Sequence, residues 1–359
     1  MNLHNELEGI TVLSLEQAVA APYCGMLLAD AGARVIKVER PEGDFARGYD
    51  TDVNGNSSIF GWLNRGKESI CLDLNEDSDK DLLCRMIKKS DVFLSNLAPG
   101  ALTRKGLSSN FIRDLNNKII NCSISGYGST GPNRNKKAYD FLIQGEVGLC
   151  SVTGTESEPS RVGISITDIA TGLTAFSAIL RALIHSIKNK KGVDIQISMF
   201  DVMADWMNMP LMAYRYGEGA PKRTALSHSF VAPYGAFETL DKKKILLSIQ
   251  NEREWSSFCS EVLDSTVLAN DKRLRNNVER FKNKDYLEKR IAECFRAKTK
   301  SDIVKKLESA NIAFSDLNSV KDLSDHYLLR NKDIYFDENA ISIADLPVNS
   351  VTSASSSVP

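Results

Sequence analysis

One carboxylate in this 359-residue chain stands where a nucleophile could be held. Asp168 follows the apolar, β-branched residues Ile164 and Ile166 and precedes an apolar stretch that predicts a helix from Ile169 to about Ile187. No Lys or Arg lies within five residues of it along the chain. A carboxylate at a strand-to-helix turn can serve as a nucleophile. The alternative is that Asp168 only caps the helix, a position that favours Asp.

A glycine-rich segment and several cations are further candidates for ligand binding. The segment 126–131 matches G-x-G-x-x-G after a predicted strand, but the polar, basic loop 132–137 follows it where a dinucleotide site needs a helix. We therefore do not interpret it as an NAD site, although its backbone N–H groups beside basic side chains could cradle phosphate. Other cations follow predicted βα units and would suit a polyphosphate, or else are solvated surface charges: Arg40, Lys67, Arg104 and Lys105.

The elements that must position these residues alternate between strand and helix. Apolar strands are predicted at 10–14, 34–39, 69–74, 91–95, 118–123 and 193–198. Helices are predicted between and after them, at 22–32, 77–89, 101–106, 111–116 and 200–213. This alternation, with nearly continuous apolar strands, indicates an α/β fold: a Rossmann-like large domain whose mostly parallel sheet is buried on both faces.

The character of the chain changes after residue 213. Residues 214–224 carry Gly, Pro and charge and are predicted to be a linker between a large domain, 1–213, and a small α+β domain, 225–310. The small domain is expected to contain a hairpin at 235–249 and three helices, at 252–263, 284–297 and 301–309. The C-terminal segment 311–359, with strand-like pieces at 334–336 and 340–343 and a Ser-rich end, is expected to return to the large domain.

Composition limits the class of protein. The net charge of −1 gives no support for nucleic acid as a partner. The seven scattered cysteines and four histidines show neither metal-ligand spacing nor a disulfide framework, which favours free thiols in the cytoplasm. Met1–Glu8 is polar and unlike a secretory signal. Polar residues interrupt the longest apolar stretch, so we expect no membrane partner.

Several segments, taken in order, resemble the family III CoA-transferases. They include L-E-G-I-T-V-L at 7–13, L-A-D-A-G-A-R-V-I-K-V-E-R-P at 28–41 and N-R-G-K-E-S-I-C-L-D-L at 64–74. D-V-F-L-S-N at 91–96, S-G-Y-G at 125–128 and T-D-I-A-T-G at 167–172 follow with matching spacing. The resemblance covers at least residues 7–250, and jointly these motifs are highly specific.

The resemblance implies an enzyme that transfers CoA through a covalent aspartyl–CoA thioester on Asp168. It implies a Rossmann-like large domain and a small domain, in a homodimer whose subunits interlock like rings. A CoA thioester is the substrate, and no tightly bound cofactor is expected. The implied CoA-binding residues are Val19, Ala20, Arg40, Leu72, Asp73, Leu74, Asn75, Asn96, Leu97, Ala98, Arg104, Lys137, Tyr139 and Asp140. We also expect the helix N-terminus to help keep Asp168 ionised.

The sequence departs from the family pattern at two places and resembles one branch of the family more closely. Some family members have Gln where this chain has Val19, and a glycine-repeat loop in the small domain that is missing here, so the groups that stabilise the oxyanions are not carried over. The segments 16–22 and 43–50 look like the branch that acts on mesaconate, itaconate, malate or citramalate. In that interpretation Arg47, His228 and Tyr234 contact the substrate; otherwise His228 is a loop histidine with a satisfied hydrogen bond.

Two other functions remain as alternatives. An α-methylacyl-CoA racemase shares the fold but needs a base on each face of the α-carbon, supplied by a His-Asp pair in those enzymes. Here the pair is Tyr139-Asp140, which disfavours the racemase. A non-catalytic CoA-binding protein would not need Asp168 as a nucleophile.

Overall fold

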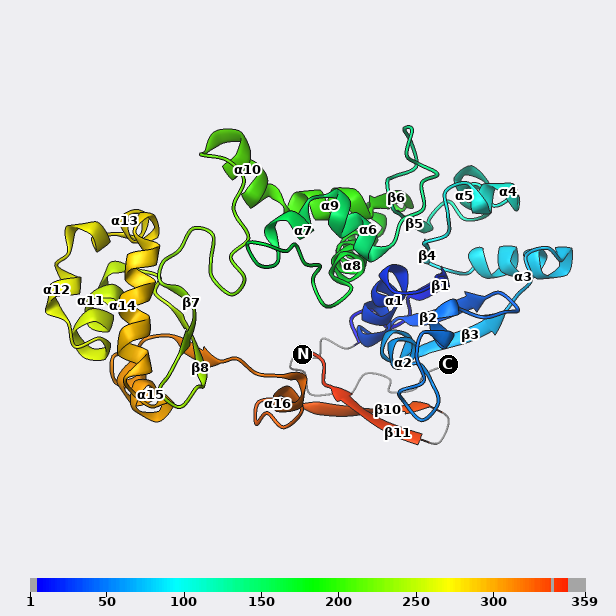
Figure 1. Ribbon diagram of the computed structural model, residues 1–359. Helices are drawn as coiled ribbons and strands as arrows, with labels where there is room; N and C mark the ends of the chain where they lie inside the picture. Colours follow the sequence, from blue (N-terminus) through cyan, green and yellow to red (C-terminus); the bar gives the residue numbers. More distant parts are fainter. Residues whose placement is uncertain (1–4, 337–338, 348–359) are drawn as a thin grey trace. The chain divides into compact units, whose positions relative to one another are not determined.

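The computed structural model describes residues 5–336 and 339–347, and the Ser-rich end lies outside them. The chain forms two compact units (Figure 1). The large unit comprises Met1–Cys150, Arg161–Gly217 and Arg330–Pro359, and the small unit comprises Ser151–Ser160 and Glu218–Leu329. Each unit is described by itself.

A parallel sheet of six strands is the centre of the large unit, in the order β3-β2-β1-β4-β5-β6. The strands are β1 (Thr11–Leu15), β2 (Arg34–Glu39), β3 (Lys67–Cys71), β4 (Val92–Ser95), β5 (Ile120–Ser125) and β6 (Val193–Ser198). This is the strand order of dinucleotide-binding folds, in which ligands bind beyond the carboxyl ends of the strands where the order reverses, here between β1 and β4.

Helices cover both faces of the sheet because alternate strand residues point to opposite sides. Val12 of β1 packs in one buried cluster with α1 (Ala20–Asp30) and α8 (Ile166–Asn189), while its neighbour Leu13 packs in another with α3 (Asp77–Ile87) and α5 (Ser109–Leu115). The other elements of this unit are η1 (Phe45–Gly48), α2 (Ser58–Asn64), α4 (Ala101–Arg104), α6 (Asp140–Glu146), α9 (Met199–Trp206), α10 (Asn208–Tyr216), β10 (Asn331–Phe336) and β11 (Asn339–Ala344). The boundary between the two units falls within α7 (Leu149–Val152).

The α8 helix is long and apolar enough to cross a membrane by length and composition alone. One such helix is weak evidence, because the core helix of a globular domain passes the same test. Ala170, Ala175 and Ile179 are fully buried in the core of the large unit, so α8 has an inward face that packs against protein.

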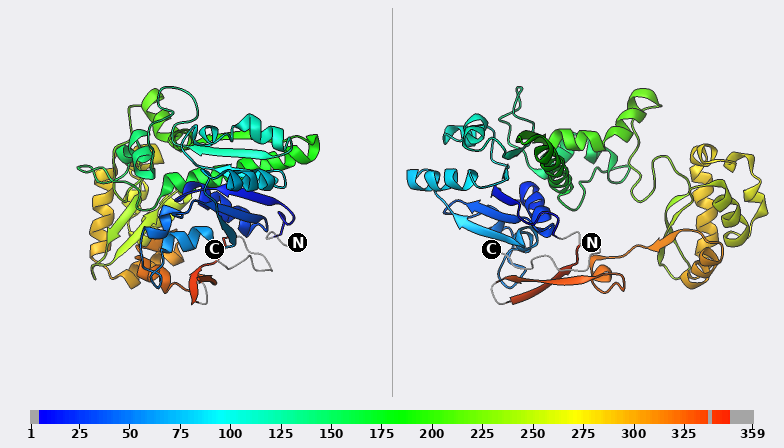
Figure 2. Two further views of the ribbon diagram at one scale, coloured as in Figure 1. Left: turned by 90° about the vertical axis from the view of Figure 1, so that its right-hand side faces the viewer. Right: turned by 180° about the vertical axis from the view of Figure 1, so that it is seen from behind.

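The C-terminal strands form an antiparallel hairpin, β10–β11, that packs beside α2 in the large unit (Figure 2). The Phe336 ring lies so close to Gly61 that a Cβ there would be 2.2 Å from it. Glycine at position 61 therefore permits this contact.

The small unit has an antiparallel sheet, β7-β8-β9, with helices packed around one hydrophobic cluster. The expected boundaries need correction. The small unit continues to Leu329 rather than ending at 310, and it includes 151–160, where the Arg223 guanidinium donates hydrogen bonds to the carbonyls of Thr155 and Glu156 at 2.7 and 2.8 Å. Its elements are β7 (Tyr234–Glu238), β8 (Lys244–Ser248), α11 (Glu252–Ser257), η2 (Phe258–Val262), α12 (Thr266–Ala269), η3 (Lys272–Leu274), α13 (Asn277–Lys282), α14 (Lys284–Arg296), α15 (Lys300–Ser309), β9 (Phe314–Asp316) and α16 (Val320–Ser324).

Candidate active site

Asp168 lies in the first turn of α8 but does not cap it. The helix begins at Ile166, three residues before the predicted start, with Ser165 at the N-cap position and no side-chain cap bond from it. The prediction that Asp168 is the N-cap is therefore wrong. Its carboxylate is part-buried and is not used to close its own helix.

The cap of α8 comes instead from α6. One carboxylate oxygen of Asp140 accepts the backbone N–H groups of Thr167 and Asp168 at 2.7 and 3.3 Å. The other accepts the side-chain amide of Gln144 at 2.6 Å, and the Gln144 carbonyl in turn accepts the N–H of Val162 at 2.9 Å. Asp140, expected to contact CoA, thus uses its carboxylate within the protein.

The environment of Asp168 favours its protonated form. Burial, and secondly the negative charge of Asp140, raise the pKa of Asp168 from 3.8 to about 7. The expectation that the helix N-terminus keeps it ionised is therefore corrected: burial and a like charge outweigh the helix dipole, whose effect is typically below about 2 kcal/mol. Tyr49 shares this environment, since burial and then the charges of Asp44, Asp168 and Tyr139 raise its pKa to about 12.

Close packing against α1 fixes the position of α8. Gly172, one turn after Asp168, touches the start of α1: a Cβ there would lie 2.5 Å from the Ala20 carbonyl oxygen and 3.0 Å from the Tyr23 Cβ. Val19 and Ala20, both predicted CoA contacts, are buried at this junction. This packing brings the start of α1 to the second turn of α8.

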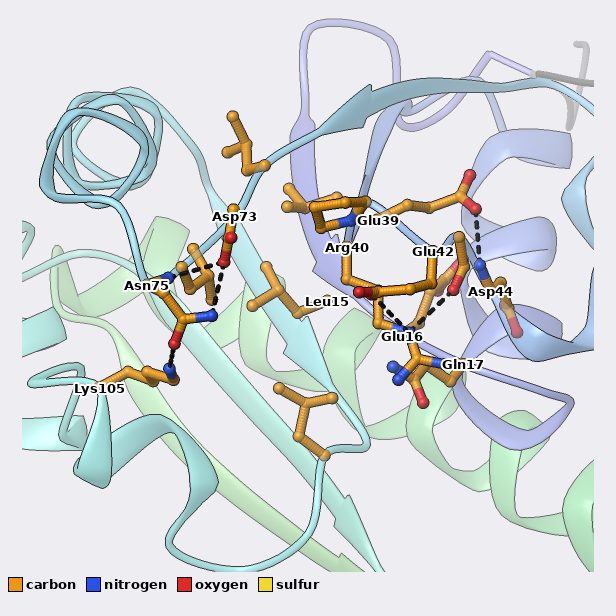
Figure 3. Close-up of a pocket in the computed structure, with 16 residues that line it drawn as sticks. Leu15, Glu16, Gln17, Glu39, Arg40, Glu42, Asp44, Asp73, Asn75 and Lys105 are labelled. Atoms are coloured by element: carbon orange, nitrogen blue, oxygen red, sulfur yellow. Dashed lines mark hydrogen bonds and ion pairs between the residues drawn. The ribbon is translucent and has the colours of Figure 1, made fainter.

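A pocket of about 270 Å³ opens beyond the carboxyl ends of β1, β2 and β3 (Figure 3). Six predicted CoA-binding residues line it: Arg40, Leu72, Asp73, Leu74, Asn75 and Leu97. Figure 3 shows Asp73, Asn75 and Lys105 on one side, joined by hydrogen bonds, and Glu16, Gln17, Glu42 and Asp44 on the other. Lys105, one of the cations that follow the predicted βα units, also lines this pocket, although the predicted site residues do not include it.

The remaining predicted CoA-binding residues do not line this pocket. The Asn96 side chain instead holds the pocket residue Gln17, accepting from its backbone N–H at 2.9 Å and donating to its carbonyl at 2.8 Å. Besides Val19, Ala20 and Asp140, described above, the set includes four exposed residues: Ala98, Arg104, Lys137 and Tyr139.

Four charged side chains form a buried network directly under the pocket. Lys37 and Lys67 face Glu16 and Asp44, and all four side chains have no exposed surface. Burial, the largest cause, lowers the pKa of Lys67 to about 8. The interpretation of Lys67 as a phosphate-binding cation is therefore corrected, because no ligand can reach its ammonium group.

This network also shapes the segment before α1. One carboxylate oxygen of Asp44 accepts the N–H groups of Ala18 and Ala46 at 3.1 and 2.9 Å, while the other binds Lys37 at 2.7 Å. Ala18 has φ of 62°, a left-handed conformation that is uncommon for a residue with a Cβ. Asp44 thus stabilises a strained turn beside the pocket.

Arg47 is already paired within the large unit. Its guanidinium binds both carboxylate oxygens of Glu39, at 2.7 and 2.9 Å, and lies 3.9 Å from the centre of the Phe60 ring. Burial raises the pKa of Glu39, but hydrogen bonds from Arg47 and Ser69 outweigh it and lower that pKa to about 2. These contacts use Nε and Nη2, so Nη1 is left to face a ligand.

The glycine-rich segment after β5 is not followed by a helix until α6 begins at Asp140. Lys136 pairs with Glu146 at 2.6 Å and lies over the Tyr127 ring, while Arg134 and Lys137 are exposed. This loop therefore lacks the strand-to-helix turn of a dinucleotide site.

His228 and Tyr234 lie together in the small unit. They line a pocket of about 580 Å³, with their ring centres 5.1 Å apart. Nδ1 of His228 accepts the backbone N–H groups of Phe230 and Val231 at 3.0 and 3.1 Å. His228 is thus the hydrogen-bonded loop histidine that was expected as the alternative, and its Nε2 is available for a ligand.

The fold and the site define an α/β protein with a pocket beyond the carboxyl ends of a parallel sheet and a separate part-buried carboxylate at a helix start. The model of CoA-transferase family III matches residues 7–357, and the chain belongs to that family. It is thus a family III CoA-transferase.

Characterised relatives span most of the chain. It is 32% identical over 326 residues to the succinyl-CoA:glutarate CoA-transferase of Homo sapiens, covering 90% of this chain and 74% of that protein. It is 28% identical to the succinyl-CoA:mesaconate CoA-transferase of Haloarcula hispanica, covering 95% and 89%. Among solved structures, a CAIB/BAIF family protein from Brucella suis matches with a TM-score of 0.84 at 30% identity, covering 100% of this chain and 96% of that one.

Proposed function

We propose that this enzyme transfers CoA from an acyl-CoA donor to a short dicarboxylic acid, with Asp168 as the covalent nucleophile. The observation that carries the proposal is the carboxylate of Asp168, which lies in the first turn of α8 while Asp140 performs the capping. The relatives named for glutarate and mesaconate support a dicarboxylate acceptor.

The proposed chemistry has two symmetric halves. The Asp168 carboxylate attacks the thioester carbonyl of the donor, which gives a mixed anhydride and CoA thiolate. The thiolate attacks the aspartyl carbonyl, releasing the donor acid as its carboxylate and leaving an aspartyl–CoA thioester. The acceptor carboxylate attacks this thioester and releases the thiolate, which then attacks the acceptor carbonyl and frees Asp168. Each step exchanges one anion for another, so covalent catalysis replaces one difficult exchange with steps of similar energy.

The pocket beside β1–β4 is the proposed site for the nucleotide part of CoA. It lies where the strand order reverses, which is the usual ligand position in this architecture. Arg40 and Lys105 supply positive charge at its rim, and Arg40 is anchored by a 3.1 Å hydrogen bond to the Gly43 carbonyl. A cationic side chain at a phosphate contributes more binding free energy than one on bare surface, because charge-assisted hydrogen bonds are stronger than neutral ones.

Arg47, through its Nη1, is the proposed acceptor contact of the large unit, and His228 and Tyr234 are separate candidates within the small unit. The 2.7 Å ion pair with Glu39 leaves Arg47 positioned and partly neutralised, so it would orient a distal carboxylate rather than bind it strongly. His228 has one ring nitrogen committed to the backbone, which fixes the direction of the other.

The racemase alternative is not supported by the geometry around Asp168. Asp140, next to Tyr139 where a racemase has its His-Asp pair, already accepts three N–H groups, and no His is available beside it in the described chain. The other alternative, a non-catalytic CoA-binding protein, is not favoured by the family match, and it differs in a measurable way.

The test is CoA exchange from succinyl-CoA to a panel of acids, with glutarate and mesaconate as dicarboxylates and butyrate as a monocarboxylate. We expect exchange with at least one dicarboxylate and its loss in Asp168→Ala, while CoA binding measured by calorimetry stays within about threefold. Full exchange by Asp168→Ala would contradict the proposed nucleophile. CoA binding without exchange by the wild-type protein on any acid would favour the binding protein.

A further inference from the structure

The first turn of α8 is held from outside by a short chain of partly buried hydrogen bonds. Asp140 binds the N–H groups of Thr167 and Asp168, and Gln144 binds the second oxygen of Asp140. Gln144 has no exposed surface and is itself fixed by the Val162 N–H. All groups that contact the Asp140 carboxylate here are N–H donors, which a carboxylate accepts without a proton of its own.

We propose that Asp140 is a positioning residue for Asp168: held by Gln144, it replaces the side-chain cap of α8 and keeps the Asp168 carboxylate beside a second negative charge. The inference rests on the proposed nucleophilic role of Asp168 and adds a purpose for Asp140 that CoA binding does not require.

The first consequence is geometric. Asp, Ser or Thr at a helix start normally turns its side chain back onto the N–H groups of its own first turn. Asp140 accepts two of those N–H groups from another helix, in place of a side chain at the N-cap position, which is Ser165. Asp168, the third residue of α8, is therefore not needed for the cap. A nucleophile that is not hydrogen-bonded to its own backbone can be directed at a substrate carbonyl.

The second consequence is electrostatic. Repulsion from Asp140 raises the free energy of the Asp168 carboxylate but not of its neutral acyl or thioester form. Acylation therefore relieves the repulsion, and Asp140 favours the aspartyl–CoA thioester over the free carboxylate. Burial is the larger cause of the raised pKa of Asp168, and the part due to Asp140 is the same repulsion seen with a proton in place of the acyl group.

Few other charges act on the pair formed by Asp140 and Asp168. Tyr49 is a titratable neighbour of Asp168, and its raised pKa keeps it neutral at ordinary pH. Charged residues on the helices packed against α8 are engaged elsewhere or exposed: Asp30 of α1 pairs with Arg65, Glu146 of α6 pairs with Lys136, and Asp201 and Asp205 of α9 are at or near the surface.

The hydrogen-bond pattern allows the charge to be moved without loss of a bond. In the double variant Asp140→Asn/Gln144→Glu, the new amide accepts the α8 N–H groups and donates to the new carboxylate, which accepts the Val162 N–H. The negative charge then lies one hydrogen bond further from Asp168. Asp140→Asn alone is the second variant; it removes the charge and leaves two N–H donors facing each other at Gln144.

The direct readout is titration of the Asp168 carboxyl by infrared spectroscopy, as the difference from the matched protein that also carries Asp168→Asn. We expect a midpoint near pH 7 in the wild type and a midpoint at least about one unit lower in both variants, since a neighbouring like charge raises a carboxyl pKa. The fraction of enzyme trapped as thioester at a fixed acyl-CoA concentration should fall several-fold.

Unchanged titration midpoints of Asp168 in both variants would overturn the inference. It would also be overturned if the midpoint fell only in Asp140→Asn and the melting temperature of that variant fell with it. A lowered midpoint in proteins that form no thioester at all would uphold the electrostatic pairing and reject the proposed function instead. The spectroscopic and chemical readouts thus distinguish the two failures.

Discussion

The protonation state of Asp168 sets the pH range in which this enzyme can react. A carboxyl with a pKa of about 7 is half protonated at neutral pH, and only the ionised form attacks a thioester. This pKa is the result of burial and of Asp140. A smaller fraction of Asp168 is therefore ionised at neutral pH, but the ionised carboxylate is more basic. Basicity favours attack as well as proton binding.

The first prediction concerns this titration. We expect kcat/KM for the donor acyl-CoA to rise about tenfold per pH unit below pH 7 and to level off above it, because the free enzyme must lose one proton from Asp168. CoA binding by Asp168→Ala over the same pH range is the control for ionisation of the ligand itself. A profile that is flat from pH 5 to 8 after this correction would contradict the assignment.

At the scale of elements, the sequence allowed the sheet to be predicted better than the site. The strands Arg34–Glu39 and Val193–Ser198 were predicted with their observed bounds, because β-branched residues recur along them. The start of α8 was missed because Ile164 and Ile166 look like the end of a strand. The cap that starts this helix comes from Asp140, twenty-eight residues away, and no local pattern contains that information.

Buried charges were the other limit of the sequence analysis. Lys37 lies within β2 and Lys67 begins β3, and a charged residue in a short strand normally indicates an exposed position. Lys67 and its partner Glu16 are 51 residues apart, while Lys37 and Asp44 are 7 residues apart, and only the folded sheet brings the four together. α2 and α6 were missed for a related reason, since both are seven-residue helices too short for a clear period.

The second prediction tests the contact that positions α8. Gly172→Ala should gain up to about 1 kcal/mol in helix propensity but lose about 1–3 kcal/mol to overpacking against the Ala20 carbonyl, which cannot move alone. We therefore expect net destabilisation in urea and a lower kcat. Gly145→Ala, in α6 with open space at its Cβ, is the matched control and should be neutral or stabilising. Equal behaviour of the two variants would show that the α1–α8 contact is not tight.

At the scale of the whole molecule, we propose that the protein is a homodimer and that the exposed face of α10 forms its interface. Met209, Met212 and Tyr216 recur at three- and four-residue spacing and are 56%, 58% and 81% exposed, and Pro210 is the one buried residue of this helix in the described chain. An apolar helix face of this kind usually marks an interface. The family resemblance to interlocked dimers agrees with it.

The third prediction is that Met212→Glu weakens the dimer. Sedimentation velocity should give a dimer for the wild type and a shift toward monomer for the variant, because burying an unpaired charge costs several kcal/mol. Lys188→Glu, on the last turn of α8 at the opposite end of that helix from Asp168, is the control for a simple change of net charge. A monomeric wild-type protein, or an unaffected variant dimer, would reject this face as the interface.

The central claim is that Asp168 carries CoA during the reaction. The most direct measurement is to incubate the enzyme with succinyl-CoA, quench with borohydride or hydroxylamine, and locate the modified residue by peptide mass spectrometry. A thioester on Asp168 should be recovered as homoserine after borohydride and as the aspartyl hydroxamate after hydroxylamine, and neither product should form in Asp168→Ala. An enzyme that exchanges CoA while Asp168 stays unmodified under both quenches would contradict the account.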